Sequence, residues 1–239
     1  MAETEPPAAA PPVIFTAAGI RHGMRRAAWL TIGMAPFGLA VGMLSERHGL
    51  SLAETVLMNA LVFAGTSQIV ALEHWSHPAP LIGPLVAAFA VNLRMALMGP
   101  VLAPWLDRLQ GWRKLATLHL VVDHSFALSV LEMQRGGRDA GFLFGAGLAL
   151  WLSWLAASTV GRLAGGVLAL PAGHPLFFAA LAAIVSLLVP LWRGRRDLLP
   201  WVVAGIVALL VARVAPGSSW YIIAGALAGS LAAGLRGGA

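Results

Sequence analysis

Long apolar stretches separated by short charged connectors form the dominant pattern in this sequence. Each stretch is close to the roughly 20 residues that an α-helix needs to span a bilayer. The pattern predicts an all-α fold, a polytopic membrane bundle with eight transmembrane segments, some of them discontinuous. Seven segments are the alternative, in which the second or third is re-entrant. The eight segments are Ala27–Leu44, Leu52–Leu72, Leu81–Trp105, Leu115–Met133, Gly141–Val160, Leu176–Trp192, Leu198–Val214 and Trp220–Leu235.

Composition supports the membrane class. Hydrophobic residues make up 59% and charged residues 11% of the 239 residues, and the mean hydropathy is +0.80, whereas soluble domains have about 45–50% apolar and about 25% charged residues. The formal net charge is +6, but the basic residues lie between apolar blocks, as the positive-inside rule produces. We therefore expect the lipid bilayer, and not nucleic acid, as the partner of this charge. The absence of cysteine excludes disulfides and thiolate metal sites.

The start of the chain differs from the rest. Residues 1–19 carry two glutamates and four prolines and lack the basic start and apolar core of a signal peptide. We expect a disordered cytoplasmic tail over residues 1–19 and a single transmembrane permease domain over residues 20–239. With the N-terminus in the cytoplasm, eight spans leave the connector Arg108–Lys114 outside, which makes it the main exception to the positive-inside rule.

Small residues recur at helical spacing in four pairs, and such pairs allow helix backbones to approach closely. We expect them to mark tight packing inside the bundle rather than a dimer face. Trp151 and Trp154 fall in the middle of a segment, where an interfacial aromatic belt does not explain them. The four pairs are Gly38 and Gly42, Gly141 and Gly145, Gly161 and Gly165, and Gly225 and Gly229.

Polar residues inside apolar segments indicate where chemistry is expected, because unsatisfied polar groups are costly there. The first place is Phe63–Gln68, which includes Gly65, Thr66 and Ser67. These residues could hold an unwound turn whose backbone groups bind a solute, as in the discontinuous helices of transporters. The alternative is a continuous helix whose hydroxyl groups bond back to its own carbonyls.

Two further places carry charge. Asn92 and Arg94 lie near the centre of the third segment, where an unpaired arginine costs roughly 2.5–3.5 kcal/mol. Asp123, with His119 and His124, lies in the fourth segment. His119 and Asp123 are four residues apart and would share a helix face, as a proton relay requires.

From these residues we predict that the second segment is interrupted near Gly65–Gln68 and the third near Asn92–Arg94. We also predict an ion pair between Arg94 and Asp123. A purely structural ion pair, or an Arg94 that caps broken-helix carbonyls, remains the alternative to a role in binding or coupling.

Catalytic motifs are not found. The sole lysine, Lys114, does not complete a phosphate-binding loop, and Glu73–His77 has the wrong order for a zinc protease. No glycine closes a nucleophile elbow around Ser67. We therefore predict that the chain is not an enzyme and has no cofactor.

An ordered set of short motifs resembles the AzlC-type branched-chain amino acid permeases, the large subunit of a two-part exporter. The resemblance covers roughly residues 19 to 236. Where that family usually has Thr-Asp-Glu, this chain has Val122-Asp123-His124, and Met95 replaces the usual His after Asn-Leu-Arg. The motifs are Ala35-Pro-Phe-Gly38, Gly49-Leu-Ser51 with Glu54, Phe63–Gln68, Asn92-Leu-Arg94 and the Phe-Ala-Leu stretch after Asp123.

The resemblance implies export of leucine, isoleucine, valine and sometimes methionine from the cytoplasm, driven by protons. It also implies a small AzlD-type membrane subunit and a location in the inner membrane, with the N-terminus in the cytoplasm. A divalent-metal or other small-solute carrier, and a non-transporting assembly factor, are the alternative functions.

Together these expectations define a candidate mechanism. Backbone N–H groups around Gly65–Gln68 would bind the substrate carboxylate, and Asn92 with Gln68 would fix its orientation. Phe37 and Phe63 would support the aliphatic side chain. Asp123, beside His124 or His119, would take up a proton and release Arg94, which gives the bundle two electrostatic states.

Overall fold

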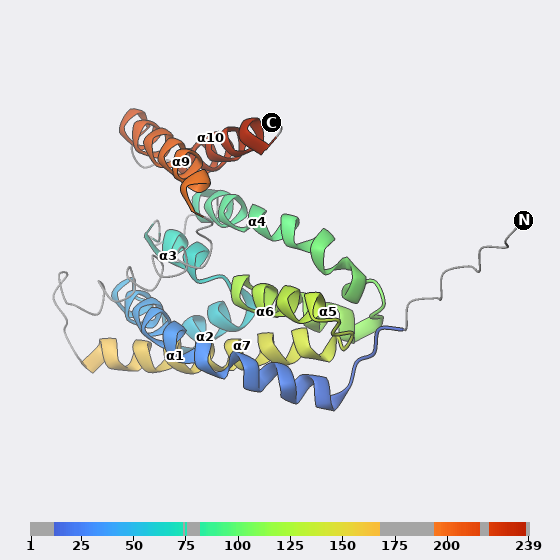
Figure 1. The fold of residues 1–239 in the computed structure, drawn as a ribbon. Helices are drawn as coiled ribbons and strands as arrows, with labels where there is room; N and C mark the ends of the chain where they lie inside the picture. Colours follow the sequence, from blue (N-terminus) through green and yellow to red (C-terminus); the bar gives the residue numbers. More distant parts are fainter. Residues whose placement is uncertain (1–11, 74, 76–81, 168–193, 216–219, 238–239) are drawn as a thin grey trace, which may run out of the picture. The chain divides into compact units, whose positions relative to one another are not determined.

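The computed structural model describes residues 12–73, 75, 82–167, 194–215 and 220–237, and these residues are helical apart from short connectors (Figure 1). The all-α prediction is confirmed for this part of the chain. The predicted sixth segment, Leu176–Trp192, lies outside the described residues. The helices are α1 (Ala17–Arg47), α2 (Leu52–Leu61), α3 (Gly65–Glu73), α4 (Ile82–Leu106), α5 (Gly111–His119), α6 (Asp123–Gln134), α7 (Gly141–Val167), α9 (Arg195–Val214) and α10 (Trp220–Gly237).

Three of the described helices, α1, α7 and α9, are long and apolar enough to cross a membrane, or four spans if the α5–α6 pair counts as one. The protein is therefore a helical membrane protein. The choice between eight spans and the seven-span alternative depends on where the connector after α4 lies. The chain folds into two compact units. Unit 1 contains residues 1–30 and 98–151, and unit 2 contains residues 31–97 and 152–239.

In unit 1, the first parts of α1 and α7 run parallel in close contact. A Cβ atom at Gly23 would fall 2.1 Å from the Phe142 carbonyl oxygen, and one at Gly145 would fall 2.0 Å from the Ile20 carbonyl oxygen. The same direction is seen just before the helices, where Ile14 forms a parallel bridge with Asp139. Glycine is required on both helices because their backbones touch.

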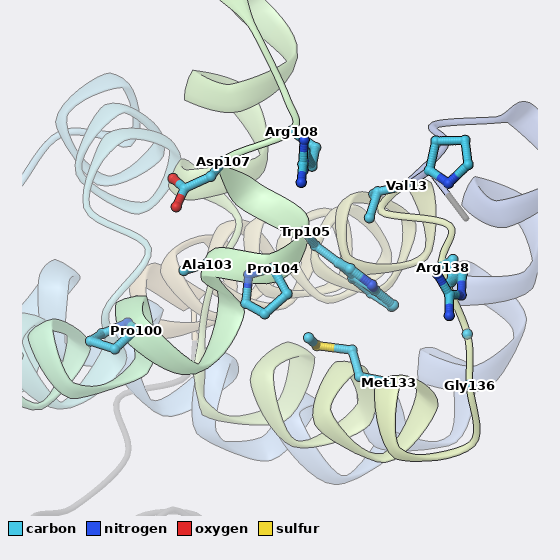
Figure 2. A pocket seen from close by; sticks show the side chains of 12 residues that line it. Val13, Pro100, Ala103, Pro104, Trp105, Asp107, Arg108, Met133, Gly136 and Arg138 are labelled. Atoms are coloured by element: carbon cyan, nitrogen blue, oxygen red, sulfur yellow. The ribbon is translucent and has the colours of Figure 1, made fainter. Parts of the chain in front are cut away.

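The connector after α4 lies at the same end of unit 1 as the segment before α1. Arg108 and Val13 line one cavity with Arg138 (Figure 2), and the Arg113 guanidinium lies 5.3 Å from the centroid of the Phe15 ring. We call residues 12–26, 107–114 and 135–140 the basic end, because they contain every arginine and lysine of unit 1.

This placement corrects one expectation. An eight-span arrangement puts Arg108–Lys114 on the side opposite to the N-terminus, whereas the structure puts this connector beside residues 12–16. The exception to the positive-inside rule therefore disappears within unit 1, because all of its basic residues gather at one end.

α5 and α6 form a helical hairpin instead of one straight segment. Their axes differ by 119° across the break. α5 begins at the basic end, and α6 returns to it, because Glu132 Oε1 lies 3.9 Å from His22 Nδ1 on α1. At the tip, a Cβ atom at Gly147 would fall 2.3 Å from the Leu120 carbonyl oxygen, so the break packs directly on α7. The predicted fourth segment, Leu115–Met133, is therefore discontinuous, a break that the sequence did not place there.

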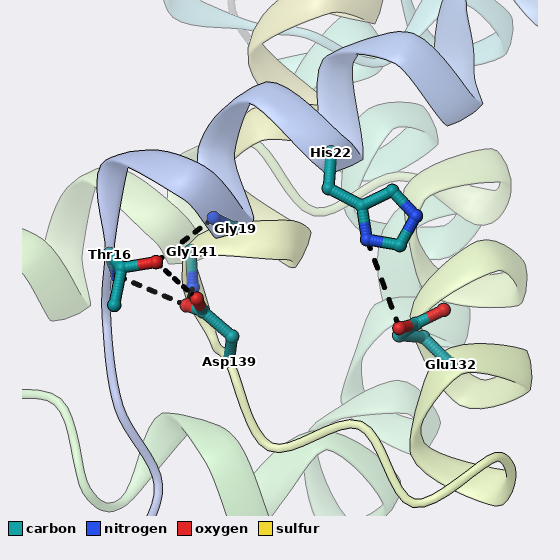
Figure 3. Close-up of polar contacts among 6 residues, drawn as sticks. All are labelled: Thr16, Gly19, His22, Glu132, Asp139 and Gly141. Atoms are coloured by element: carbon teal, nitrogen blue, oxygen red, sulfur yellow. Dashed lines mark hydrogen bonds and ion pairs between the residues drawn. The ribbon is translucent and has the colours of Figure 1, made fainter.

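One carboxylate caps both parallel helices of unit 1 (Figure 3). Asp139 accepts hydrogen bonds from the backbone N–H of Thr16 at 3.1 Å, from the Thr16 hydroxyl, and from the backbone N–H of Gly141 at 2.9 Å. The Thr16 hydroxyl oxygen in turn accepts from the backbone N–H of Gly19 at 3.0 Å. Because both helix N-termini carry partial positive charge, a shared anion stabilises the parallel arrangement. The cap therefore includes Thr16, a residue that the sequence assigned to the predicted tail.

Unit 2 repeats the close parallel packing of α1 with α7. Cβ atoms at Gly42 and Gly161 would fall 2.0 Å from the Ser158 carbonyl oxygen and 2.1 Å from the Leu39 carbonyl oxygen. In the same unit, Gly225 and Gly229 bring α10 onto α9, and Gly38 and Gly165 also have close neighbours on facing helices. The expectation that the four glycine pairs mark tight packing is confirmed.

The two predicted interruptions have different outcomes. The second segment is broken, with residues 62–64 outside the helices and Gly65–Gln68 forming the first turn of α3. The third segment is not broken, because α4 is continuous from Ile82 to Leu106. The prediction of an interruption near Asn92–Arg94 is therefore wrong, since a single polar pair in a strongly apolar run does not unwind the helix.

Candidate functional site

The candidate site in unit 2 begins with a well-formed start of α2. The Ser51 hydroxyl accepts from the Glu54 backbone N–H at 3.2 Å, and the Glu54 carboxylate accepts from the Ser51 backbone N–H at 2.7 Å. This reciprocal pair is a capping box. It explains in physical terms why Ser51 and Glu54 occur together in the sequence. It also fixes the residue at which α2, the helix that leads to the break at residues 62–64, begins.

Gly65 starts α3 because no larger residue fits there. A Cβ atom at this position would fall 2.5 Å from the Trp154 ring and 2.7 Å from the Phe37 ring. The helix start is thereby pressed against side chains from α1 and α7. The break at residues 62–64 is therefore held in place by packing as well as by its own sequence.

Three aromatic rings form the wall of the site. The ring centroid of Trp154 lies 5.2 Å from that of Phe37 and 6.5 Å from that of Phe63. All three side chains are buried. The sequence identified Phe37 and Phe63 as the apolar support, and the structure brings them together around Trp154, whose position in mid-segment the sequence left unexplained.

Polar side chains follow the break in a short chain of hydrogen bonds. The Asn59 amide donates to the Thr55 carbonyl oxygen at 2.8 Å, and the Gln68 amide donates to the Asn59 side-chain oxygen at 3.1 Å. Asn59 is fully buried. It links the end of α2 to the start of α3, and sequence reasoning missed it, although an asparagine within an apolar run is a signal that could have found it.

Several buried polar atoms at this site have no hydrogen-bond partner. They are the Gln68 side-chain oxygen, the Ser67 hydroxyl and the Trp154 indole N–H. Leaving a buried donor or acceptor unsatisfied costs about 1–3 kcal/mol. In addition, the first N–H groups of a helix have no acceptor within it, and those of α3 begin at Gly65. The site therefore presents unsatisfied donors and acceptors beside an apolar wall.

The two other residues of unit 2 that the sequence selected, Asn92 and Arg94, lie in α4. Asn92 lies in the continuous helix α4, and its side-chain oxygen is enclosed without a hydrogen-bond partner. The side chain of Arg94 lies outside the described residues, so its pairing with Asp123 stays a prediction.

The titratable residues of the fourth segment lie at the hairpin of unit 1. His119 ends α5 and Asp123 begins α6, so the expectation that they share one helix face is wrong, because the break separates them. His119 is exposed, whereas Asp123 and His124 are half-buried. Among the described residues, no three His, Asp or Glu side chains form a group that could hold a metal ion.

The break between α5 and α6 is closed by one serine. The Ser125 hydroxyl accepts from the Val122 backbone N–H at 2.9 Å and lies within hydrogen-bond distance of the Leu120 and Val122 carbonyl oxygens, at 3.1 and 3.0 Å. Ser125 is fully buried. The hairpin tip thus satisfies its own backbone groups, and no motif in the sequence predicts this role of Ser125.

Comparison with known proteins places the chain in a family. The family model described as AzlC protein matches residues 30–168. The chain is 28% identical over 223 residues to an uncharacterized membrane protein of Archaeoglobus fulgidus, covering 91% of this chain and 95% of that protein. It is 26% identical over 212 residues to the inner membrane protein YgaZ of Escherichia coli, covering 85% of each. No solved structure matches the chain. Since the family match covers more than half of the chain and both broken helix pairs, the protein belongs to the AzlC family of membrane proteins.

Proposed function

We propose that this protein exports hydrophobic amino acids, of the leucine, isoleucine and valine class, across the inner membrane. The observation that carries the proposal is the set of unsatisfied buried atoms at the start of α3, beside the wall of Phe37, Phe63 and Trp154. Membership of the AzlC family supports a role in membrane transport rather than catalysis.

The chemistry of the site fits an amino acid zwitterion. A carboxylate needs donors, and the N–H groups at the start of α3 and the Trp154 indole N–H can supply them. An ammonium group needs acceptors, which the Gln68 and Ser67 oxygens offer. Burying an aliphatic side chain against the aromatic wall contributes roughly 1.5–3 kcal/mol.

The arrangement of unit 1 supports a membrane topology in which the α2–α3 and α5–α6 pairs are both re-entrant. The end of α4 lies at the basic end, where α1 starts. If α1 and α4 each cross the membrane once, the α2–α3 pair must start and end on the side opposite to the basic end. The α5–α6 hairpin starts and ends at the basic end. The two breaks would then enter the membrane from opposite sides, an inverted arrangement that many transporters have.

Proton coupling is assigned to the hairpin of unit 1. Asp123 is half-buried at the start of α6, with His124 next to it. Protonation of Asp123 would release Arg94 and change which side of the site is open. A small AzlD-type subunit would complete the exporter, and the basic end would face the cytoplasm by the positive-inside rule.

The test is leucine export from proteoliposomes loaded with radiolabelled leucine. Gln68→Met keeps the size of the side chain but removes its polar atoms, and it should reduce export at least tenfold, which corresponds to about 1.4 kcal/mol. The matched control is Gln134→Met, at an exposed position at the end of α6, and it should export normally. Unchanged export by a folded Gln68→Met protein would disprove the site. Absence of leucine export by the wild type, with and without the small subunit, would disprove the function.

A further inference from the structure

A cavity of about 1070 Å³ lies at the basic end of unit 1 and shares no residue with the candidate transport site of unit 2 (Figure 2). Arg108 from the connector after α4 and Arg138 from the connector before α7 both line it. Trp105 extends between these two connectors, and Met133 lies on the facing helix. Three separate chain segments therefore meet around one open cavity.

The cavity has an apolar wall and a basic rim. Pro100, Ala103 and Pro104 of α4 form part of the wall. Arg108 and Arg138 are exposed residues that line the cavity. The one acidic residue of the lining, Asp107, has its charge offset by Lys114 at 3.2 Å. The cavity is therefore electropositive, and two like charges on one rim favour a bound anion.

We propose that this cavity binds an anionic phospholipid, with the phosphodiester between Arg108 and Arg138 and the acyl chains along the α4 wall. Arginine recognises phosphate oxygens through paired N–H donors. Basic pockets between transmembrane helices on the cytoplasmic side bind acidic lipid headgroups. A free phosphate would satisfy the same arginines, but it would leave the apolar wall next to it uncovered.

The position of the cavity favours the lipid over a soluble anion. Pro100 and Pro104 are exposed residues of a 25-residue apolar helix, so the wall faces the region that lipid occupies. All basic residues of unit 1 gather at this end, and the positive-inside rule places such an end at the anionic leaflet. A lipid bound here would tie the connector after α4 to the segments that precede α1 and α7.

The experiment measures thermal unfolding and bound lipid for the full-length protein in detergent. Phosphatidylglycerol should raise the unfolding temperature by about 5–10 °C at 100-fold excess over its dissociation constant, whereas phosphatidylcholine should not. Native mass spectrometry should retain phosphatidylglycerol on the wild type. The double variant Arg108→Gln with Arg138→Gln should lose at least half of this shift and most of the retained lipid.

Two controls make the proposal falsifiable. The double variant Arg25→Gln with Arg26→Gln removes the same charge from exposed positions of α1 outside the cavity, and it should respond to phosphatidylglycerol as the wild type does. Arg108→Gln alone replaces the double variant if the latter does not fold. Equal stabilisation of wild type and cavity variants would overturn the site. Equal stabilisation by inorganic phosphate or glycerol phosphate would overturn the lipid as its occupant.

Discussion

The α2–α3 and α5–α6 pairs have the same order and similar lengths of helix and break, but the polar groups at the two breaks are hydrogen-bonded differently. Each pair starts five residues after a long helix ends, at Leu52 after Arg47 and at Gly111 after Leu106. Each then has a helix of nine or ten residues, a break of three residues and a second helix. In the first pair, Ser67 and Gln68 leave buried oxygens unsatisfied, whereas in the second, Ser125 closes the break.

This difference separates two roles that one architecture can serve. A break whose polar groups are unsatisfied favours a ligand that supplies the missing hydrogen bonds. A break that is closed on itself is a stable tip, and its titratable neighbours can then act as a switch. The second helices begin accordingly with Gly65 in one pair and Asp123 in the other.

The largest expected effect concerns the sides from which the two pairs enter the membrane. The chain contains no cysteine, so single cysteines can be added at His48, Asp107 and Arg135. Asp107→Cys and Arg135→Cys should react with an impermeant maleimide from the same side, and His48→Cys only from the other. Labelling of all three from one side would contradict the proposal that the pairs enter from opposite sides.

Asp123→Asn tests the switch assigned to the second pair. Because the amide cannot take up a proton, export driven by a pH gradient should be abolished while leucine binding remains measurable by thermal shift. Ser67→Ala, in the first pair, should instead weaken binding and leave the dependence on the gradient intact. Normal gradient-driven export by Asp123→Asn would reduce Asp123 to a structural residue.

The second tip should not tolerate an added methyl group on the helix against which it packs. Gly147→Ala should destabilise the protein by about 3 kcal/mol, at the upper end of overpacking effects, because its Cβ would meet the rigid backbone of Leu120. Gly99→Ala is the control, since nothing lies within 4 Å of its Cβ position. Thermal unfolding of the two variants measures the difference, and equal stability would show that the second tip can shift.

The smallest expected effect is in the two serines. Ser125→Ala leaves the buried Val122 N–H without its acceptor and should cost about 1–3 kcal/mol of folding stability. Ser67→Ala should cost less than about 0.5 kcal/mol, because its hydroxyl has no hydrogen bond to lose. Chemical denaturation compares them, and a larger loss for Ser67→Ala would contradict the assignment of open and closed breaks.

The sequence predicts the break before α3 but not the one before α6, and the reason is local chemistry. Gly65, Thr66 and Ser67 weaken a helix by their own properties. The second break has only Leu120, Val121 and Val122, which are ordinary residues of a membrane helix. What unwinds the chain there is the Ser125 hydroxyl, which replaces backbone hydrogen bonds only once the hairpin has formed.

The same distinction applies to the site residues. Phe37 and Phe63 could be selected because they accompany small and polar residues in the sequence. Trp154 could not be assigned, because its role depends on contacts with aromatic rings of other segments. Asn59 has a signal in its place within an apolar run, but its partner Gln68 could not be predicted from that signal. For Asn92 and Arg94 the sequence instead predicted too much. Their polar side chains suggested a break in an apolar run, but α4 is continuous through both residues.

The carboxylate shared by α1 and α7 also has a consequence for biosynthesis. Asp139 is made 123 residues after Thr16, whose backbone it caps. At about 5–20 residues per second, the start of α1 must wait roughly 6–25 s on the ribosome for that partner to appear. For most of this interval α1 (Ala17–Arg47) is fully synthesised but lacks both its cap and its parallel neighbour. Unit 1 therefore cannot close progressively from its N-terminus, and its assembly is completed by the last of its helices to leave the ribosome.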